Sequence, residues 1–341
     1  MRYALNTLSW SSITLLVAVL LILGSQGSAV AADCDTSIRD GKSGQCVPRG
    51  APLKQTKTAL VEFATSPFPF DGTVPEKDTA FLDVISGERR GHRTPRGRVL
   101  WEDVTYRERR ALLHIPKGFD FTRPSVMIVF FHGHGATLRR DVRDRQLVPA
   151  QISASGVNVV LVAPQFAFNA SDSSPGKFWE PGAFGKFVAE AGNRLAELHG
   201  NPLAAQTFAN MPVVIVAYSG GYLATAWSLE VGGVENRVRG VVLLDALYGE
   251  LDKFTTWIAN NRSSFFVSAY TDSTEQKNAA LKTMLAEQEI KFETALKQGK
   301  WKPGVTFLST NPEIKHEDFV TQAWAVYPIR DILRRLDEFR R

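Results

Sequence analysis

The sequence predicts an α/β fold in which a mostly parallel sheet is flanked by helices. Short apolar runs alternate with segments of helical spacing over the last two-thirds of the 341-residue chain. These runs are rich in β-branched residues and have no polar face, which is typical of strands buried on both sides. Strands that alternate with helices form βαβ units. Only about eighteen residues separate Asp245 from the next apolar run, so we expect no large cap domain.

Each predicted element follows from its local pattern. Apolar runs predict strands over residues 110–116, 125–131, 157–164, 213–217, 239–245, 263–270 and 305–310. Helical spacing predicts helices over 137–153 with an interruption near Pro149, over 183–200, directly after Ser219, over 275–299 and over 328–339. Gly200 is placed to end the second of these helices, and Pro328 suits the first position of the last one.

The first residues have the pattern of a secretory signal. Arg2 provides a positive charge, residues 13–23 form an apolar stretch, and "SAVAAD" contains a small-residue cleavage site. We therefore expect residues 1–31 to be a signal peptide and the mature protein to be secreted or periplasmic; an uncleaved anchor is the alternative. No other long apolar run follows, so we expect no stable membrane insertion after cleavage.

The only two cysteines, Cys34 and Cys46, follow the cleavage site closely. In an oxidising compartment we expect them to form a disulfide, which would stabilise the fold by about 3 kcal/mol. Catalysis by cysteine and a thiolate metal site are then improbable. Residues 32–75 lack periodicity and predict an extended N-terminal segment, which leaves 76–341 as the functional domain.

Positive charge is mild overall but clustered. Lys and Arg number 40 against 35 Asp and Glu. The clusters lie at 88–98, 107–110, 139–145 and the C-terminus. Solvated surfaces are the simpler interpretation, and contact with an anionic envelope polymer or membrane surface is the alternative. With an export signal and no recognisable binding motif, we expect no nucleic-acid partner.

The stretch "VVIVAYSGGYLAT" (213–225) places Ser219 between a predicted buried strand and a predicted helix. The five residues from Ala217 to Gly221 are one substitution away from G-x-S-x-G, and their context is the one which that motif requires. Here the chain resembles the α/β-hydrolase family, over roughly residues 100 to 341. An ordinary Ser-Gly-Gly turn is the alternative.

The resemblance implies a Ser-His-acid triad in the 76–341 domain and no cofactor. It assigns Ser219 as the nucleophile and His316, in the loop after the last predicted strand, as the base. Asp272 occupies the family's usual position for the acid that orients the histidine. Asp245, which follows the preceding strand, is the alternative acid.

The segment "FFHGHGA" (130–136) resembles the family's oxyanion loop. The resemblance makes the backbone amides of His134 and Gly220 the candidate oxyanion donors, with Gly133 shaping the loop. His132 is expected to hold the loop through a hydrogen bond. His132 and His134 as two metal ligands are an alternative, but no further histidine lies nearby in the sequence, and we expect no metal.

The loop 168–184 is the expected wall of the substrate cleft. Phe178 and Trp179 within it suit either substrate binding or coverage of the core, and the sequence does not separate these roles. The hypothesis is an exported serine hydrolase that cleaves a carboxylic ester, less readily an amide, of a small molecule or polymer such as a cell-envelope component. A non-catalytic cell-envelope-binding module on the same fold is the rival.

Overall fold

The computed structural model describes residues 37–39, 46–48, 51–75, 77–297, 299 and 302–341. The predicted signal peptide (1–31) and Cys34 lie outside these residues, so export and the Cys34–Cys46 disulfide stay predictions. The chain divides into two units, 1–49 and 50–341. In the first, β1 (Ser37–Arg39) pairs antiparallel with β2 (Cys46–Pro48).

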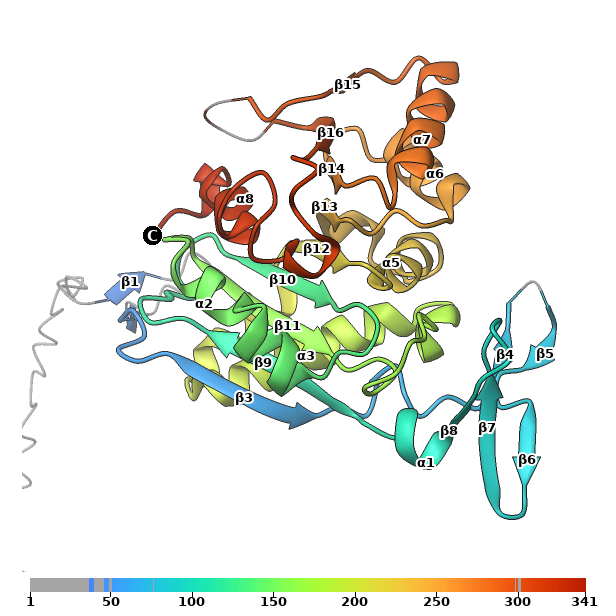
Figure 1. Ribbon diagram of the computed structural model, residues 1–341. Coiled ribbons are helices and arrows are strands. Elements are labelled where there is room, and N and C mark those ends of the chain that lie inside the picture. Colours follow the sequence, from blue (N-terminus) through green and yellow to red (C-terminus); the bar gives the residue numbers. More distant parts are fainter. Residues whose placement is uncertain (1–36, 40–45, 49–50, 76, 298, 300–301) are drawn as a thin grey trace, which may run out of the picture. The chain divides into compact units, whose positions relative to one another are not determined.

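A nine-stranded sheet forms the centre of the second unit (Figure 1). Only β9 runs against its neighbours, and the other eight strands share one direction, so the predicted mostly parallel sheet is confirmed. In spatial order the strands are β15 (Phe292–Glu293), β16 (Gly304–Ser309), β14 (Phe265–Tyr270), β13 (Val238–Leu244), β12 (Val213–Tyr218), β10 (Val126–Phe131), β11 (Val159–Pro164), β9 (Arg110–Ile115) and β3 (Lys57–Glu62).

Helices cover both faces of this sheet, because successive residues of each central strand point to opposite sides. Val129 and Phe131 of β10 pack in one apolar cluster, whereas Ile128 and Phe130 pack in another. The first cluster is covered by α3 (Ala183–His199), α4 (Ala205–Asn210), α5 (Gly221–Glu230), α6 (Leu251–Asn260) and α7 (Glu275–Glu287). The second is covered by η1 (Leu138–Arg145), α2 (Val148–Ser153) and α8 (Pro328–Arg334).

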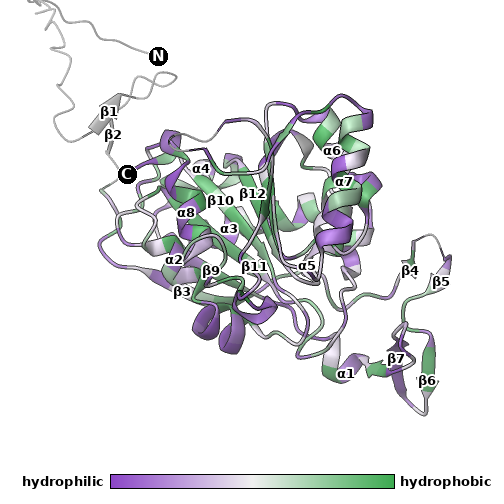
Figure 2. Ribbon diagram, turned by 45° about the horizontal axis from the view of Figure 1, so that its top comes forward, coloured by the Kyte–Doolittle hydropathy of each residue, from purple (hydrophilic) through white to green (hydrophobic). Residues whose placement is uncertain are grey.

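Apolar residues follow the central strands, and polar residues lie on the outer surfaces of the helices (Figure 2). The short turns η2 (Gly176–Trp179), η3 (Pro202–Ala204), η4 (Glu235–Arg237), η5 (His316–Asp318) and η6 (Asp337–Phe339) complete the helical elements. No helix of the described residues is long and apolar enough to cross a membrane.

Between β3 and β9 the chain leaves the main sheet and forms a small excursion over residues 73–105 (Figure 1). It consists of β4 (Thr73–Val74) with β5 (Thr79–Ala80), the sheet β6 (Val84–Ser86), β7 (Arg89–Arg93) and β8 (Val99–Trp101), and α1 (Glu102–Thr105). Because β3 belongs to the main sheet, the folded unit begins before the boundary that we predicted at residue 75. The basic cluster 88–98 lies in this excursion.

Two predicted helices differ from those observed. The 137–153 helix is divided into η1 and α2 at Leu147, whose φ of 54° interrupts it two residues before Pro149. The 275–299 helix ends at Glu287, and Phe292 enters β15 instead. There its ring packs edge-on against Phe307 of β16 with ring centroids 5.4 Å apart. Tertiary packing therefore overrides the helical spacing of this segment.

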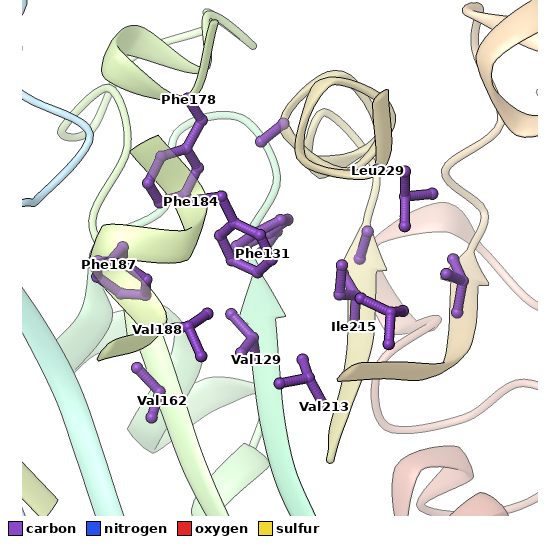
Figure 3. Close-up of a cluster of buried hydrophobic side chains, with 14 of the residues drawn as sticks. Val129, Phe131, Val162, Phe178, Phe184, Phe187, Val188, Val213, Ile215 and Leu229 are labelled. Atoms are coloured by element: carbon purple, nitrogen blue, oxygen red, sulfur yellow. The ribbon is translucent and has the colours of Figure 1, made fainter. Parts of the chain in front are cut away.

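Phe178 lies in the first cluster, among Phe131, Phe184 and Phe187 (Figure 3). Replacing Phe178 with Ala should lower the free energy of unfolding by about 3–5 kcal/mol, because the side chain is fully buried and leaves a cavity. Urea denaturation measures this change. Val104→Ala, at a side chain 58% exposed, is the control and should shift stability by less than about 0.5 kcal/mol. A Phe178→Ala protein as stable as this control would contradict the assignment to the core.

Candidate active site

Ser219 forms a sharp turn between β12 and α5. Tyr218 ends the strand, Gly220 caps the helix, and Ser219 has a φ of 53°. This left-handed conformation costs a non-glycine residue roughly 1–2 kcal/mol. Residues held in this way cluster at functional sites, and the turn places the Ser219 hydroxyl at the carboxyl edge of the sheet.

Two glycines make this turn sterically possible. A Cβ at Gly133 would lie 2.6 Å from the Cβ of Ser219, and one at Gly221 would lie 2.5 Å from the carbonyl oxygen of Phe131. Any larger residue at position 133 would push the loop after β10 away from Ser219. Any larger residue at position 221 would push the start of α5 away from β10.

His316 lies at the start of η5, in the segment that follows β16. Its Nε2 is 2.8 Å from Ser219 Oγ, although 97 positions separate the two residues in the chain. The Tyr218 ring stacks on the imidazole with centroids 5.0 Å apart, and the Tyr218 hydroxyl donates to the His316 carbonyl at 2.9 Å. Burial raises the pKa of the Tyr218 phenol, which keeps it protonated as the donor. Tyr218 thus fixes both the ring and the backbone of His316.

Asp245 holds the other side of the imidazole. It directly follows β13, is fully buried, and accepts the Nδ1–H of His316 on Oδ2 at 2.6 Å. That bond fixes the tautomer, so Nε2 is free to accept the Ser219 hydroxyl proton.

Further donors surround the Asp245 carboxylate. It accepts the Thr271 N–H at 3.1 Å and the hydroxyls of Thr271, Ser273 and Thr274 at 2.8, 2.7 and 2.6 Å. Burial alone would raise the pKa of this carboxyl, but the bonds from His316 and from these donors together lower it well below its usual value. Asp245 is therefore ionised at neutral pH, so that its negative charge can stabilise the imidazole when this ring takes up a proton.

Asp272, which we predicted as the acid, is exposed and does not meet the imidazole. The structure places the alternative, Asp245, there instead. The physical reason lies in the turn after β14: its hydroxyl side chains, on both sides of Asp272, point inward and donate to Asp245. The Asp272 side chain then points to solvent.

The loop after β10 is fixed by His132. The His132 ring is buried, donates from Nδ1 to the Gly133 carbonyl at 2.8 Å, and accepts the Phe166 N–H on Nε2 at 2.9 Å. Burial lowers the pKa of this imidazole to about 4, so it stays neutral. Both nitrogens are used within the protein, as expected of a residue that holds the loop.

His134 projects from the same loop over the start of α5. Its Nε2 lies 2.6 Å from the Ser173 hydroxyl, and both side chains lie directly above Gly220, where a Cβ would be 2.6 Å from Ser173 Oγ. Within the part of the chain that the structure describes, the backbone N–H groups of His134 and Gly220 donate no hydrogen bond. Gly220 also precedes the first turn of α5, whose dipole favours negative charge.

A cavity of about 610 Å³ opens beside this turn. His134, Ser173, Trp179 and Tyr222 line one side of it, and residues of the β4–β8 excursion line the other. A larger cavity of about 730 Å³ lies at the opposite edge of the sheet, among residues that precede β12, β13 and β14, and is therefore remote from Ser219.

The two aromatic residues proposed for the cleft wall have different places. Trp179 lines the cavity, whereas Phe178 is fully buried in the core and does not reach it. Phe178 therefore takes the core role, the second of its two predicted alternatives.

Among the described residues, no group of three or more His, Cys, Asp or Glu side chains is arranged to hold a metal ion. The metal alternative for His132 and His134 also meets a chemical obstacle. Both ring nitrogens of His132 are already bonded within the loop.

The order and direction of the strands can now be combined with the position of the turn at Ser219. Ser219, Asp245 and His316 follow β12, β13 and β16 in this chain order, and all meet at the carboxyl edge of the sheet. The protein has an α/β-hydrolase fold. The expectation from the sequence is confirmed, and the connection from β13 to β14, which carries α6, contains no cap domain.

Solved structures similar to this chain include three enzymes. A feruloyl esterase module from Clostridium thermocellum is 14% identical, with 82% of this chain and 96% of that chain covered and a TM-score of 0.42. An S-formylglutathione hydrolase from Agrobacterium tumefaciens is 9% identical over 70% and 92%, with a TM-score of 0.40. An IroE-like serine hydrolase from Shewanella oneidensis is 11% identical over 78% and 76%, with a TM-score of 0.39. No family model and no curated protein sequence matches the chain.

Sequence reasoning missed the residues that support the α/β-hydrolase site. In the sequence, Tyr218 is only the variable position before Ser219, and nothing there indicates its contact with His316. The donors to Asp245 lie in "TDST" (271–274), where a cluster of hydroxyl residues was a usable signal for a buried carboxylate nearby. Ser173, the partner of His134, had no distinguishing sequence context.

Asp245→Asn should lower kcat for ester hydrolysis by about 10⁴-fold, because asparagine cannot hold the correct imidazole tautomer or stabilise the imidazolium. Asp272→Asn should change kcat by less than about twofold, since its side chain is exposed. Steady-state kinetics on both variants, with folding checked by circular dichroism, measures the difference. Equal losses would contradict the placement of Asp245.

Tyr218→Phe should lower kcat about threefold to tenfold with KM nearly constant, because the lost hydrogen bond positions His316 rather than substrate. Tyr270→Phe is the matched control, since its hydroxyl accepts from Lys282 instead. A Tyr218→Phe effect confined to KM would contradict a positioning role.

Proposed function

We propose that the protein is an exported serine hydrolase that cleaves a carboxylic ester through an acyl-enzyme. The observation that carries the proposal is the unbroken chain of hydrogen bonds from Asp245 through His316 to Ser219, with lengths of 2.6 and 2.8 Å. Each contact has the length and direction that proton transfer from a serine hydroxyl requires.

Acylation begins when Ser219 Oγ attacks the ester carbonyl and His316 Nε2 takes the hydroxyl proton. The carbonyl oxygen becomes an oxyanion, which the N–H groups of Gly220 and His134 are placed to bind. One such donor contributes about 3–4 kcal/mol to the stabilisation of the transition state. His316 then gives its proton to the leaving alcohol oxygen, the C–O bond breaks, and the acyl group stays on Ser219.

Deacylation repeats these steps with water. His316 takes a proton from the water, whose oxygen attacks the acyl carbon, and the same two N–H groups bind the new oxyanion. His316 returns the proton to Ser219 Oγ as the carboxylic acid leaves. Asp245 stays ionised throughout and stabilises the imidazolium, which is the role suited to its lowered pKa.

Two observations favour hydrolysis over a non-catalytic envelope-binding module. Ser219 is held in a conformation that costs free energy, and Asp245 is buried with a full set of donors. A binding surface needs neither feature. An ester is preferred to an amide because an alcohol is the easier leaving group.

Export rests on the sequence pattern of residues 1–31. It would place the enzyme in the secreted or periplasmic space, where a small-molecule or polymer ester, including a cell-envelope component, is the proposed substrate. N-terminal sequencing of the mature protein tests the cleavage.

A fluorophosphonate probe should label the wild-type protein at Ser219, as identified by peptide mass spectrometry. Ser219→Ala should abolish labelling and lower turnover of p-nitrophenyl acetate by about 10⁵- to 10⁶-fold. Ser263→Ala, at the opposite edge of the sheet, is the control and should still be labelled. A folded wild-type protein that never labels at Ser219 would end the proposal.

A further inference from the structure

The cavity beside Ser219 has a charge pattern that the hydrolytic mechanism does not use. Its lining contains three cationic side chains, Lys77, Arg93 and Arg96, and three carboxylates. Which of these groups can bind a ligand depends on which are already held by hydrogen bonds or ion pairs within the protein.

The carboxylates have partners within the protein. Asp172 accepts the Tyr106 hydroxyl on one oxygen at 2.9 Å and the Ser174 hydroxyl on the other at 2.9 Å. Asp83 accepts the backbone N–H of Arg93 at 2.7 Å. Glu250 pairs with the Lys253 ammonium at 3.1 Å. Glu250 is therefore offset by Lys253, whereas the hydrogen bonds hold Asp172 and Asp83 in place without cancelling their negative charge.

The cations differ. Among the described residues, no carboxylate lies within ion-pair distance of Lys77, Arg93 or Arg96, although Arg89 and Arg90 in the same basic cluster are paired with Asp103, Asp71 and Glu102. All three cations are exposed. The basic residues that line the cavity are thus the ones without an ion-pair partner among the described residues.

The cavity adjoins the proposed reaction centre, and His134 contributes to both. This residue lines the cavity, lies above Gly220, and has its pKa lowered by burial; the Asp172 carboxylate opposes this shift, and Arg96 adds to it. An ester bound at Ser219 can therefore extend past His134 into the cavity that Arg93 and Arg96 line.

We propose that Arg93 and Arg96 bind an anionic group, such as a carboxylate, on the ester that Ser219 cleaves. This inference deepens the proposed function, because it names the charge of the substrate. Arg93 lies at the end of β7 and Arg96 in the turn that leads to β8, so both residues line the cavity from one hairpin. Guanidinium groups match the planar geometry of a carboxylate.

The test compares matched esters that differ by one charge. Mono-p-nitrophenyl glutarate carries a carboxylate on the acyl side, and its methyl ester is neutral. 4-Acetoxybenzoate and its methyl ester place the charge on the alcohol side. The measured quantity is the ratio of kcat/KM for the anionic ester to that for its neutral partner, in each pair.

The ratio should fall about fivefold in Arg96→Gln and about twentyfold in Arg93→Gln/Arg96→Gln for the pair whose charge reaches the hairpin. It should also fall with rising salt, because the guanidiniums are exposed. Arg143→Gln is the control: this half-buried arginine on η1 pairs with Asp144 outside the cavity, so the ratio should stay constant. A ratio in the double variant equal to that of the wild type, in both pairs, would overturn the proposal.

A binding measurement separates this inference from the proposed function. If Ser219-dependent hydrolysis is absent for every ester, the hydrolase assignment fails, and titration calorimetry with monomethyl glutarate on the Ser219→Ala protein decides the anion site. Binding that weakens at least tenfold when Arg93 and Arg96 are also changed to Gln supports the site. Binding that is unchanged, or no binding to the Ser219→Ala protein, rejects it.

Discussion

The buried carboxylate of Asp245 is the constraint on which the site depends. A charge removed from water needs hydrogen bonds on every side, and Asp245 obtains them from the turn after β14 and from His316. This requirement joins the end of β13, the end of β14 and the segment after β16. The imidazole orientation follows from it, and the orientation of the imidazole decides whether Ser219 has a base.

The sheet explains why distant residues meet. Parallel strands end at one edge, so residues that directly follow β12 and β13 are neighbours in space although the strands are separated by a helix in sequence. The turn at Ser219 then needs room, which Gly133 and Gly221 provide. Tyr218 adds the last restraint, since its ring and hydroxyl both contact His316.

The sequence predicted the sheet and the turn at Ser219, because continuous apolar runs and a strand–Ser-Gly-Gly–helix pattern are local signals. His316 was assigned from the resemblance, which expects a histidine in the loop after the last strand. The resemblance favoured Asp272 over Asp245 because Asp272 occupies the family's usual acid position. Both residues follow neighbouring strands, and strand order does not show which side chain turns inward. That choice is made by hydrogen bonds to hydroxyl groups 26 to 29 positions away from Asp245. Phe178 was ambiguous for the same reason: an aromatic residue in a loop suits a cleft or a core equally, and only packing separates them.

The most direct test of the central claim is the proton NMR spectrum of the imidazole N–H groups, recorded for the wild type, Asp245→Asn and Asp272→Asn. The bond from His316 Nδ1–H to a buried carboxylate should give a signal far downfield of the backbone amides, absent from His316→Gln. The account predicts that this signal is lost in Asp245→Asn and kept in Asp272→Asn. A signal kept in Asp245→Asn and lost in Asp272→Asn would contradict it.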